Sequence, residues 1–154
     1  MVGWYIFRLT KALAQLTHEE LIIYSHSLDN AIMLSDHEKV SFNLLGGRFF
    51  PKNRFYYSLN ETEILKSINF DIAFIGAAGL KNGKVSFDDQ EDAYLKQLVL
   101  KNSQTKILLA EQDKFDKSAS FILSDISIFD YFITDKKPKK KIRKNIAGNV
   151  KIIY

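Results

Sequence analysis

The chain has 154 residues, of which 46% are apolar and 26% charged, the composition of a globular protein and not of a disordered or fibrous one. It has no cysteine, which excludes disulfides, thiolate zinc sites, iron–sulfur clusters and a cysteine nucleophile, and its three histidines leave little for a metal site. No apolar run is long enough to span a bilayer, so we expect one soluble cytoplasmic domain over residues 1–154, without metal, cofactor or membrane partner.

Short apolar runs alternate with segments of helical spacing along the whole chain. The first helix is predicted from Ile6 to Leu16. The predicted strands are Leu21–Tyr24, Val40–Leu45, Phe70–Ile75, Lys106–Ala110, Tyr131–Thr134 and Val150–Tyr154. The further predicted helices are one after an N-cap at Ser27, Glu61–Ile68 after an N-cap at Asn60, residues 89–102, and Lys139–Ala147 before Gly148.

The order of these elements predicts the fold class. Apolar runs of four to six residues without strict alternation are typical of strands buried on both faces, as in a parallel sheet. Strands that alternate with helices indicate an α/β domain with a mostly parallel sheet and right-handed crossovers. Residues 46–57 interrupt the alternation and are predicted to form an excursion with a short strand or hairpin.

Candidate binding residues follow the predicted strands, because ligands of open α/β sheets bind outside the carboxyl ends of the strands. Glycine lets a backbone N–H approach an anion, and a cation matches the charge of a phosphate. The candidates are Ser25, His26, Ser27, Gly46, Gly47, Arg48, Gly76, Ala77, Ala78, Gly79 and Lys114.

Each candidate also has a plain structural interpretation. Gly46-Gly47 has about even odds of being only a tight turn, and Lys114 beside Asp113 is more often half of a surface ion pair. A lone histidine such as His26 is usually structural. The Gly76–Gly79 segment fits neither the dinucleotide fingerprint nor a nucleotide P-loop.

The positive charge is confined to one stretch. Residues 136–144 carry seven Lys or Arg, more than the net charge of +4, so the rest of the chain has a net charge of −3. Such a run can contact a nucleic-acid backbone. With Ile142 and Ile146 four residues apart, the pattern favours a solvated helix face, since no DNA-reading motif accompanies it.

Five segments in register resemble the sensor domain of the DeoR/GlpR family of bacterial sugar-metabolism repressors. They are Tyr24–Ser27, Leu44–Arg48, Asp71–Leu80, Ile107–Phe115 and Asp130–Asp135. The resemblance implies a Rossmann-like sensor domain akin to ribose-5-phosphate isomerase, which binds a phosphorylated sugar and oligomerises. It implies a binding module and not an enzyme, with Lys114 near a sugar oxygen or the phosphate.

The resemblance begins at about residue 9. The family's DNA-binding winged helix-turn-helix and first sensor strand have no counterpart, so we expect an N-terminally truncated sensor that meets operator DNA only through that missing domain. Gly3 aligns with the family's D-x-G-T-T segment, while Trp4 and Tyr5 replace its threonines. The alternatives are an isomerase-like enzyme, with Asp113 as the carboxylate base and Lys114 as the cation near the enediolate, and a degenerate fragment that only oligomerises.

Overall fold

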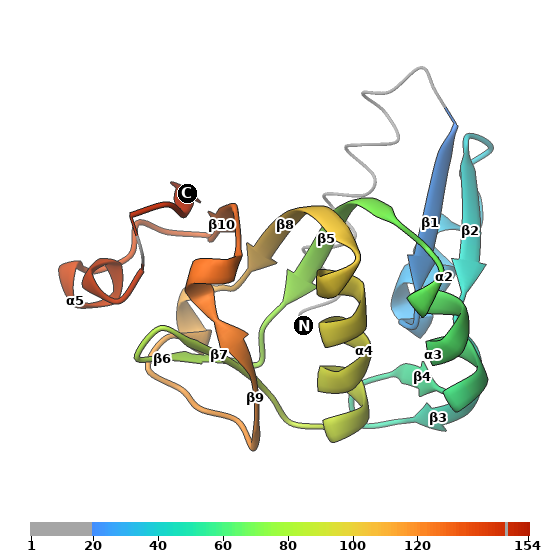
Figure 1. The fold of residues 1–154 in the computed structure, drawn as a ribbon, viewed down its shortest axis with the longest axis horizontal. Helices are drawn as coiled ribbons and strands as arrows, with labels where there is room; N and C mark the ends of the chain where they lie inside the picture. The colour runs from blue at the N-terminus through green and yellow to red at the C-terminus, as the bar shows by residue number, and fades with distance from the viewer. Residues whose placement is uncertain (1–19, 147) are drawn as a thin grey trace. The chain divides into compact units, whose positions relative to one another are not determined.

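The computed structural model describes residues 20–146 and 148–154 (Figure 1). The chain divides into two compact units, residues 1–64 and 65–154. The predicted helix Ile6–Leu16 and the residues Gly3, Trp4 and Tyr5 lie outside the described residues. The prediction of one domain over the whole chain stays a prediction.

Unit 1 contains a parallel strand pair joined by a helix. Strands β1 (Leu21–Ser25) and β2 (Val40–Leu44) pair in parallel, and α2 (Leu28–Leu34) connects them. The predicted N-cap is confirmed, because the Ser27 hydroxyl accepts a hydrogen bond from the Asn30 N–H at 3.3 Å. Both predicted strands are therefore present, with boundaries shifted by one residue.

The predicted excursion in unit 1 is an antiparallel hairpin of β3 (Arg48–Phe50) and β4 (Phe55–Tyr57). Phe50 and Phe55 are opposite each other and stack at 4.6 Å between ring centroids. Helix α3 (Leu59–Lys66) begins two residues earlier than predicted. Ser58 accepts from the Glu61 N–H at 3.4 Å, so Ser58 takes the N-cap place that the sequence assigned to Asn60.

Unit 2 is built on the predicted parallel sheet. Its order is β11 (Lys151–Ile153), β10 (Tyr131–Ile133), β8 (Ser103–Leu109) and β5 (Phe70–Gly76), and every neighbouring pair is parallel. Helix α4 (Gln90–Lys101) precedes β8, and the short helix α5 (Lys140–Lys144) precedes β11. This arrangement confirms the mixed α/β fold with a mostly parallel sheet.

A second, antiparallel sheet in unit 2 was not predicted. It contains β6 (Gly79–Lys81), β7 (Lys84–Phe87) and β9 (Phe121–Asp125). Asn82 and Gly83 form the two-residue turn between β6 and β7, with φ of 51° and 75°. Asn-Gly between two short strands is the sequence signature of a type I′ hairpin, so this turn was readable in the sequence and was missed.

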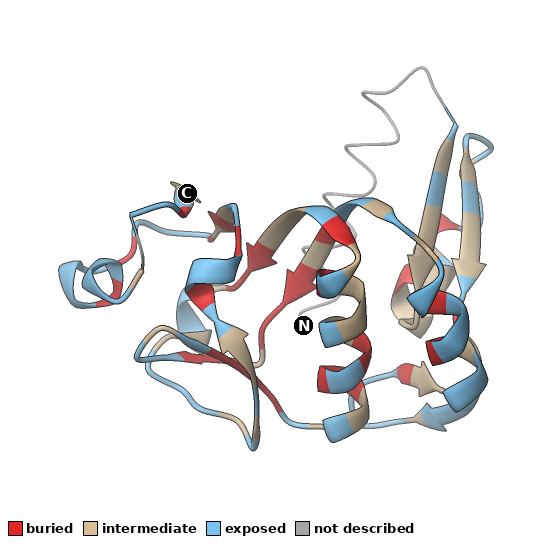
Figure 2. Cartoon of the chain, viewed as in Figure 1, coloured by how far each residue is buried: buried red, intermediate tan, exposed pale blue. Residues whose placement is uncertain are grey.

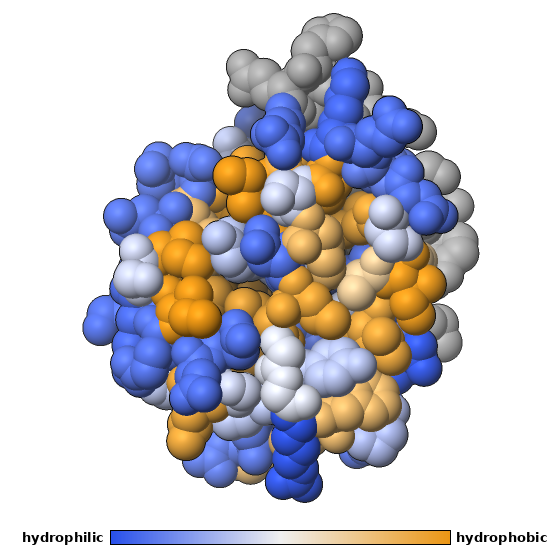
Figure 3. All heavy atoms as spheres, turned by 90° about the vertical axis from the view of Figure 1, so that its right-hand side faces the viewer, coloured by the Kyte–Doolittle hydropathy of each residue, from blue (hydrophilic) through white to orange (hydrophobic). Residues whose placement is uncertain are grey.

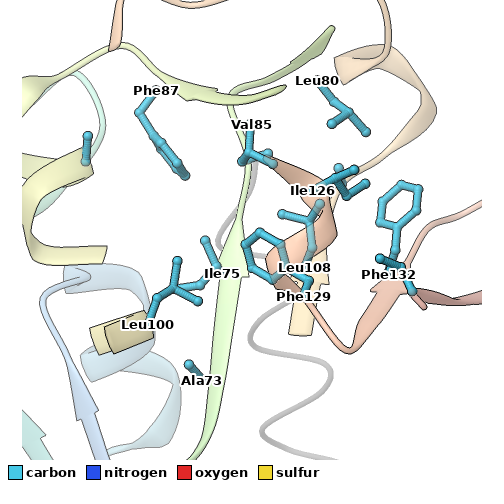
Figure 4. Close-up of a cluster of buried hydrophobic side chains, with 14 residues drawn as sticks. Ala73, Ile75, Leu80, Val85, Phe87, Leu100, Leu108, Ile126, Phe129 and Phe132 are labelled. Atoms are coloured by element: carbon cyan, nitrogen blue, oxygen red, sulfur yellow. The ribbon is translucent and has the colours of Figure 1, made fainter. Parts of the chain in front are cut away.

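Fourteen buried side chains form the core of unit 2 (Figure 4). Phe132 and Leu108, from adjacent strands, are fully buried, and Val85 and Phe87 come from β7. Burying one such side chain contributes about 1.5–3 kcal/mol. The core therefore packs the parallel sheet against the antiparallel one. This packing holds the carboxyl ends of the parallel strands in place.

Within the described residues, no helix combines the length and the apolar character needed to cross a membrane. The same residues contain no group of three potential metal-binding side chains.

Candidate functional site

The candidates in unit 1 meet at the carboxyl ends of β1 and β2. Ser25 is in register with Leu44, and the Leu45 N–H donates to the Ser25 carbonyl at 2.8 Å. Parallel pairing thus brings the Ser25–Ser27 segment beside the segment that begins at Gly46.

The Ser25 hydroxyl oxygen already accepts two hydrogen bonds. Its Oγ accepts from the Ser27 N–H at 3.2 Å and from Asn30 Nδ2 at 3.0 Å. A serine oxygen has two lone pairs and one proton, so this hydroxyl retains only its donor capacity. No described residue accepts its proton. Such a hydroxyl suits an oxygen that only accepts, as in a phosphate.

Asn30 is a polar residue at this site that the sequence analysis missed. It is 5% exposed, and its Oδ1 atom is buried without a hydrogen-bond partner among the described residues. A buried amide usually has all of its groups paired, so this position is unusual. The available signal was an Asn three residues after an N-cap serine, on the inward face of a short helix.

The other unit 1 candidates differ in role. The His26 ring packs edge-on against Phe55 at 5.4 Å, and its carbonyl accepts from the Tyr56 N–H, which ties β1 to the hairpin. Arg48 is exposed, with its guanidinium 4.8 Å from the centre of the Phe50 ring. His26 therefore has a structural role in the hairpin, as weighed above, while Arg48 presents its charge to solvent.

The two glycines of unit 1 are not equivalent. Gly47 has a φ of +118°, and a Cβ there would lie 2.3 Å from the Tyr57 carbonyl oxygen, so the turn requires glycine. A Cβ on Gly46 would meet nothing within 4 Å. Gly47 is thus explained by the tight turn, and Gly46 borders open space.

In unit 2 the structure brings Gly76–Gly79 beside the segment that carries Lys114. Leu80 forms a parallel bridge with Phe115, and the Asp116 N–H donates to the Leu80 carbonyl at 2.9 Å. Gly79 allows this approach, since a Cβ there would lie 2.7 Å from the Lys117 carbonyl oxygen.

The backbone of this glycine segment is already hydrogen-bonded. The Ala77 N–H donates to the Leu109 carbonyl at 3.0 Å, and the Ala78 N–H donates to the Ser86 carbonyl at 3.1 Å. Ser86 Oγ also donates to the Gly79 carbonyl and accepts from the Ala119 N–H. The segment is therefore held by hydrogen bonds to β8 and β7, and the Ala77 and Ala78 N–H groups are not free to bind an anion.

Lys114 forms the surface ion pair that its neighbour suggested. Its Nζ lies 2.9 Å from Asp113 Oδ2, and Lys117 Nζ lies 3.6 Å from the same oxygen. The Lys114 hydrogen bond lowers the pKa of the Asp113 carboxyl, and the charges of both lysines add to this effect against some desolvation. The cluster has two cations and one anion, so it keeps a positive charge for a ligand oxygen.

Asp135 also lies at this edge and was not among the candidates. Its Oδ1 accepts from the Gln112 N–H at 2.7 Å and from the Thr134 hydroxyl at 3.3 Å. These bonds connect the residues that follow β8 and β10 and fix the start of the 3-10 turn Gln112–Lys114. The signal was a Thr-Asp pair directly after a predicted strand.

Comparisons with known proteins identify the family of the chain. A model of the DeoR C-terminal sensor domain matches residues 7–136. The chain is 28% identical over 118 residues to the HTH-type transcriptional repressor GlcR of Bacillus subtilis, covering 77% of the chain and 46% of that protein. It is 26% identical over 115 residues to the lactose phosphotransferase system repressor of Lactococcus lactis, covering 75% and 45%.

The deoxyribose operon repressor of Escherichia coli K12 is 25% identical over 132 residues, which are 84% of the chain and 52% of the repressor. The chain thus spans about half the length of the curated relatives it matches.

Proposed function

The chain belongs to the family of DeoR C-terminal sensor domains, and from that premise we propose that it binds a phosphorylated sugar and relays this binding to a DNA-binding part of a sugar-metabolism regulator. The family match over residues 7–136 carries the proposal. The names of the relatives support the ligand class, because they include a deoxyribose operon repressor and a repressor of a lactose phosphotransferase system. A regulator of this kind acts in the cytoplasm.

The chemistry of the two candidate groups supports an anionic, oxygen-rich ligand. In unit 1, the Ser25 hydroxyl can only donate, and Arg48 is exposed. In unit 2, Lys114 and Lys117 together outweigh Asp113. A phosphate monoester offers acceptor oxygens and negative charge, which such donors and cations bind. We propose that the ligand contacts five residues: Ser25, Ser27, Gly46, Arg48 and Lys114. The contacts in each unit are tested separately.

An isomerase-like enzyme is the competing proposal, and the geometry favours it less. Aldose–ketose proton transfer needs a carboxylate base with a pKa near the working pH. The hydrogen bond from Lys114 lowers the pKa of Asp113, which makes this carboxylate a weaker base. The residues after β5 are Ala77 and Ala78 and supply no acid. Turnover of ribose 5-phosphate by this chain would reverse the preference.

A thermal-shift screen against phosphorylated sugars tests the proposal, with inorganic phosphate and the unphosphorylated sugars as controls. A ligand at 100 times its Kd adds about 2.7 kcal/mol to the stability, which raises the Tm of a domain of this size by roughly 5–10 °C. We expect one phosphosugar to give such a rise. A flat panel contradicts the proposal and leaves the third interpretation, a fragment that only oligomerises.

Two variants then test the candidate groups one unit at a time. Loss of a charge-assisted hydrogen bond costs about 1.5–3 kcal/mol, so Ser25→Ala is expected to weaken phosphosugar binding about 10- to 100-fold. Ser41→Ala, an exposed serine of β2, is its matched control and is expected to bind normally. Lys114→Gln makes the same test in unit 2. If a variant binds the phosphosugar with an unchanged Kd, the substituted side chain does not contact the ligand.

A further inference from the structure

Residues 136–144, here named the basic segment, form the most highly charged surface of unit 2. All seven cations of the segment are exposed: Lys136, Lys137, Lys139, Lys140, Lys141, Arg143 and Lys144. In Figure 2 most of the α5 ribbon is pale blue, the colour of exposed residues, with a buried stretch in red. Because the rest of the chain has a net charge of −3, the charge of the molecule is strongly asymmetric.

Apolar residues spaced by four hold the basic segment in place. Pro138 is buried, Ile142 is 6% exposed, and Ile146 packs against the core of unit 2. The cations lie between these positions and have their side chains in solvent. The segment is therefore a positive surface fixed to the core, and it shows no exposed apolar side chain of its own.

This positive charge is almost uncompensated. Lys141 pairs with Asp116 at 3.3 Å, in a bridge whose two side chains are largely exposed and which contributes little. Lys137 lies 5.6 Å from the centre of the Tyr154 ring, which does not neutralise it. Among the described residues, the other five cations have no acidic partner. A polyanion placed against the segment would relieve their mutual repulsion.

We propose that the basic segment contacts the phosphate backbone of duplex DNA. A protein partner usually needs a buried apolar or aromatic anchor at the interface. The apolar residues of the segment itself, Pro138 and Ile142, are buried, and the exposed Tyr154 ring beside it has the Lys137 ammonium 5.6 Å from its centre. A phosphate backbone needs only cations, and it is uniformly charged. The sequence pattern alone favoured a solvated face; the fixed, unpaired cations and the family of transcriptional regulators, on which the proposed function also rests, favour DNA.

The test is the salt dependence of binding to a fluorescent duplex of scrambled sequence, measured by anisotropy with the whole chain. Each phosphate contact contributes about −0.9 to the slope of log K against log[salt]. In the variant Lys139→Ala/Lys140→Ala/Lys144→Ala we expect the slope to become shallower by about 2.7. The control Lys39→Ala/Lys52→Ala/Lys101→Ala removes the same charge from other exposed positions and should keep the slope.

Three results would overturn the inference. One is no retention of the duplex by the unmodified chain at low salt. A second is an equal loss of slope in both triple variants, which would assign the effect to net charge. The third is binding of poly-L-glutamate with the affinity of the duplex, which would make an acidic polypeptide the better partner. The phosphosugar thermal shift should be unchanged in the Lys139/Lys140/Lys144 variant, so failure of the sensor proposal is seen separately.

Discussion

The two units differ in how much apolar surface they bury. All fourteen residues of the principal core belong to unit 2, whereas the large buried side chains of unit 1 among the described residues are Leu34, Leu45 and Phe55. Unit 1 leaves Ile22 68% and Leu59 70% exposed. Figure 3, which views the side of Figure 1 with β1, β2 and α3, shows orange apolar surface among blue hydrophilic side chains.

The comparison indicates that unit 2 resists local unfolding more strongly than unit 1. The described part of unit 1 has two separate two-stranded sheets and short helices, which enclose little apolar surface, whereas unit 2 has a four-stranded sheet with helices and a second sheet. Segments with few buried contacts open first in native-state exchange. We therefore expect mutations in the two units to differ in how far their effects spread.

The largest effect is expected for Phe132→Ala in unit 2. Phe132 is 0% exposed, and truncating a buried phenylalanine costs about 3–5 kcal/mol. Its matched counterpart is Phe55→Ala in unit 1, at 3% exposure. Hydrogen exchange followed by mass spectrometry should show lost protection throughout unit 2 for Phe132→Ala and a loss confined to unit 1 for Phe55→Ala. Equal loss in unit 2 from both variants would contradict the comparison.

A medium effect is expected at the hairpin turn of unit 1. Gly47→Ala forces a Cβ against the Tyr57 carbonyl at a positive φ, and such strain costs about 1–3 kcal/mol. Gly46→Ala, its neighbour with open space, should change the stability by less than about 0.5 kcal/mol. Urea unfolding by circular dichroism measures both. If the two variants unfold alike, the turn does not require glycine at position 47.

The smallest effect is expected for Asp113→Asn in unit 2. The folded-state pKa of Asp113 is lowered, so its ion pair stabilises the fold above the usual aspartate pKa and is lost as the pH falls through the lower folded value. The pair is exposed, so at pH 7 the variant should lose less than about 1 kcal/mol. The free energy of unfolding of the variant should also fall less steeply as the pH is lowered. If the free energy of unfolding falls with acid in the same way in both proteins, this ion pair contributes nothing to the stability.

The parallel strands could be predicted because they are rich in apolar, β-branched and aromatic residues. The expected burial on both faces is wrong for part of them, since Ile22 of β1 is 68% exposed and Ile72 of β5 is 45% exposed. Strand β9 has only three consecutive apolar residues before Ser124 and Asp125, and β6 and β7 have only three and four residues. Their Asn82-Gly83 turn was the missed signal. Boundaries moved as well: β8 begins at Ser103, three residues before the predicted strand.

The positions of the candidate residues could be predicted from the strand ends, but their bonding could not. The Ala77 N–H bond to Leu109 continues the predicted pairing of β5 with β8, whereas the Ala78 N–H bond to Ser86 depends on β7 of the unpredicted sheet. The Asn30–Ser25 hydrogen bond likewise depends on how α2 returns over β1. Long-range pairing decides which polar groups stay open to a ligand.

The central claim, that this sensor domain recognises a phosphorylated sugar, is tested most directly by calorimetric titration. The phosphosugar that raises the Tm most would be titrated into the chain beside its unphosphorylated parent. We predict saturable binding of the phosphosugar and at least tenfold weaker binding of the parent, because the donors and cations of the candidate groups match the phosphate. No heat up to millimolar ligand, or equal affinity for both sugars, would contradict the account.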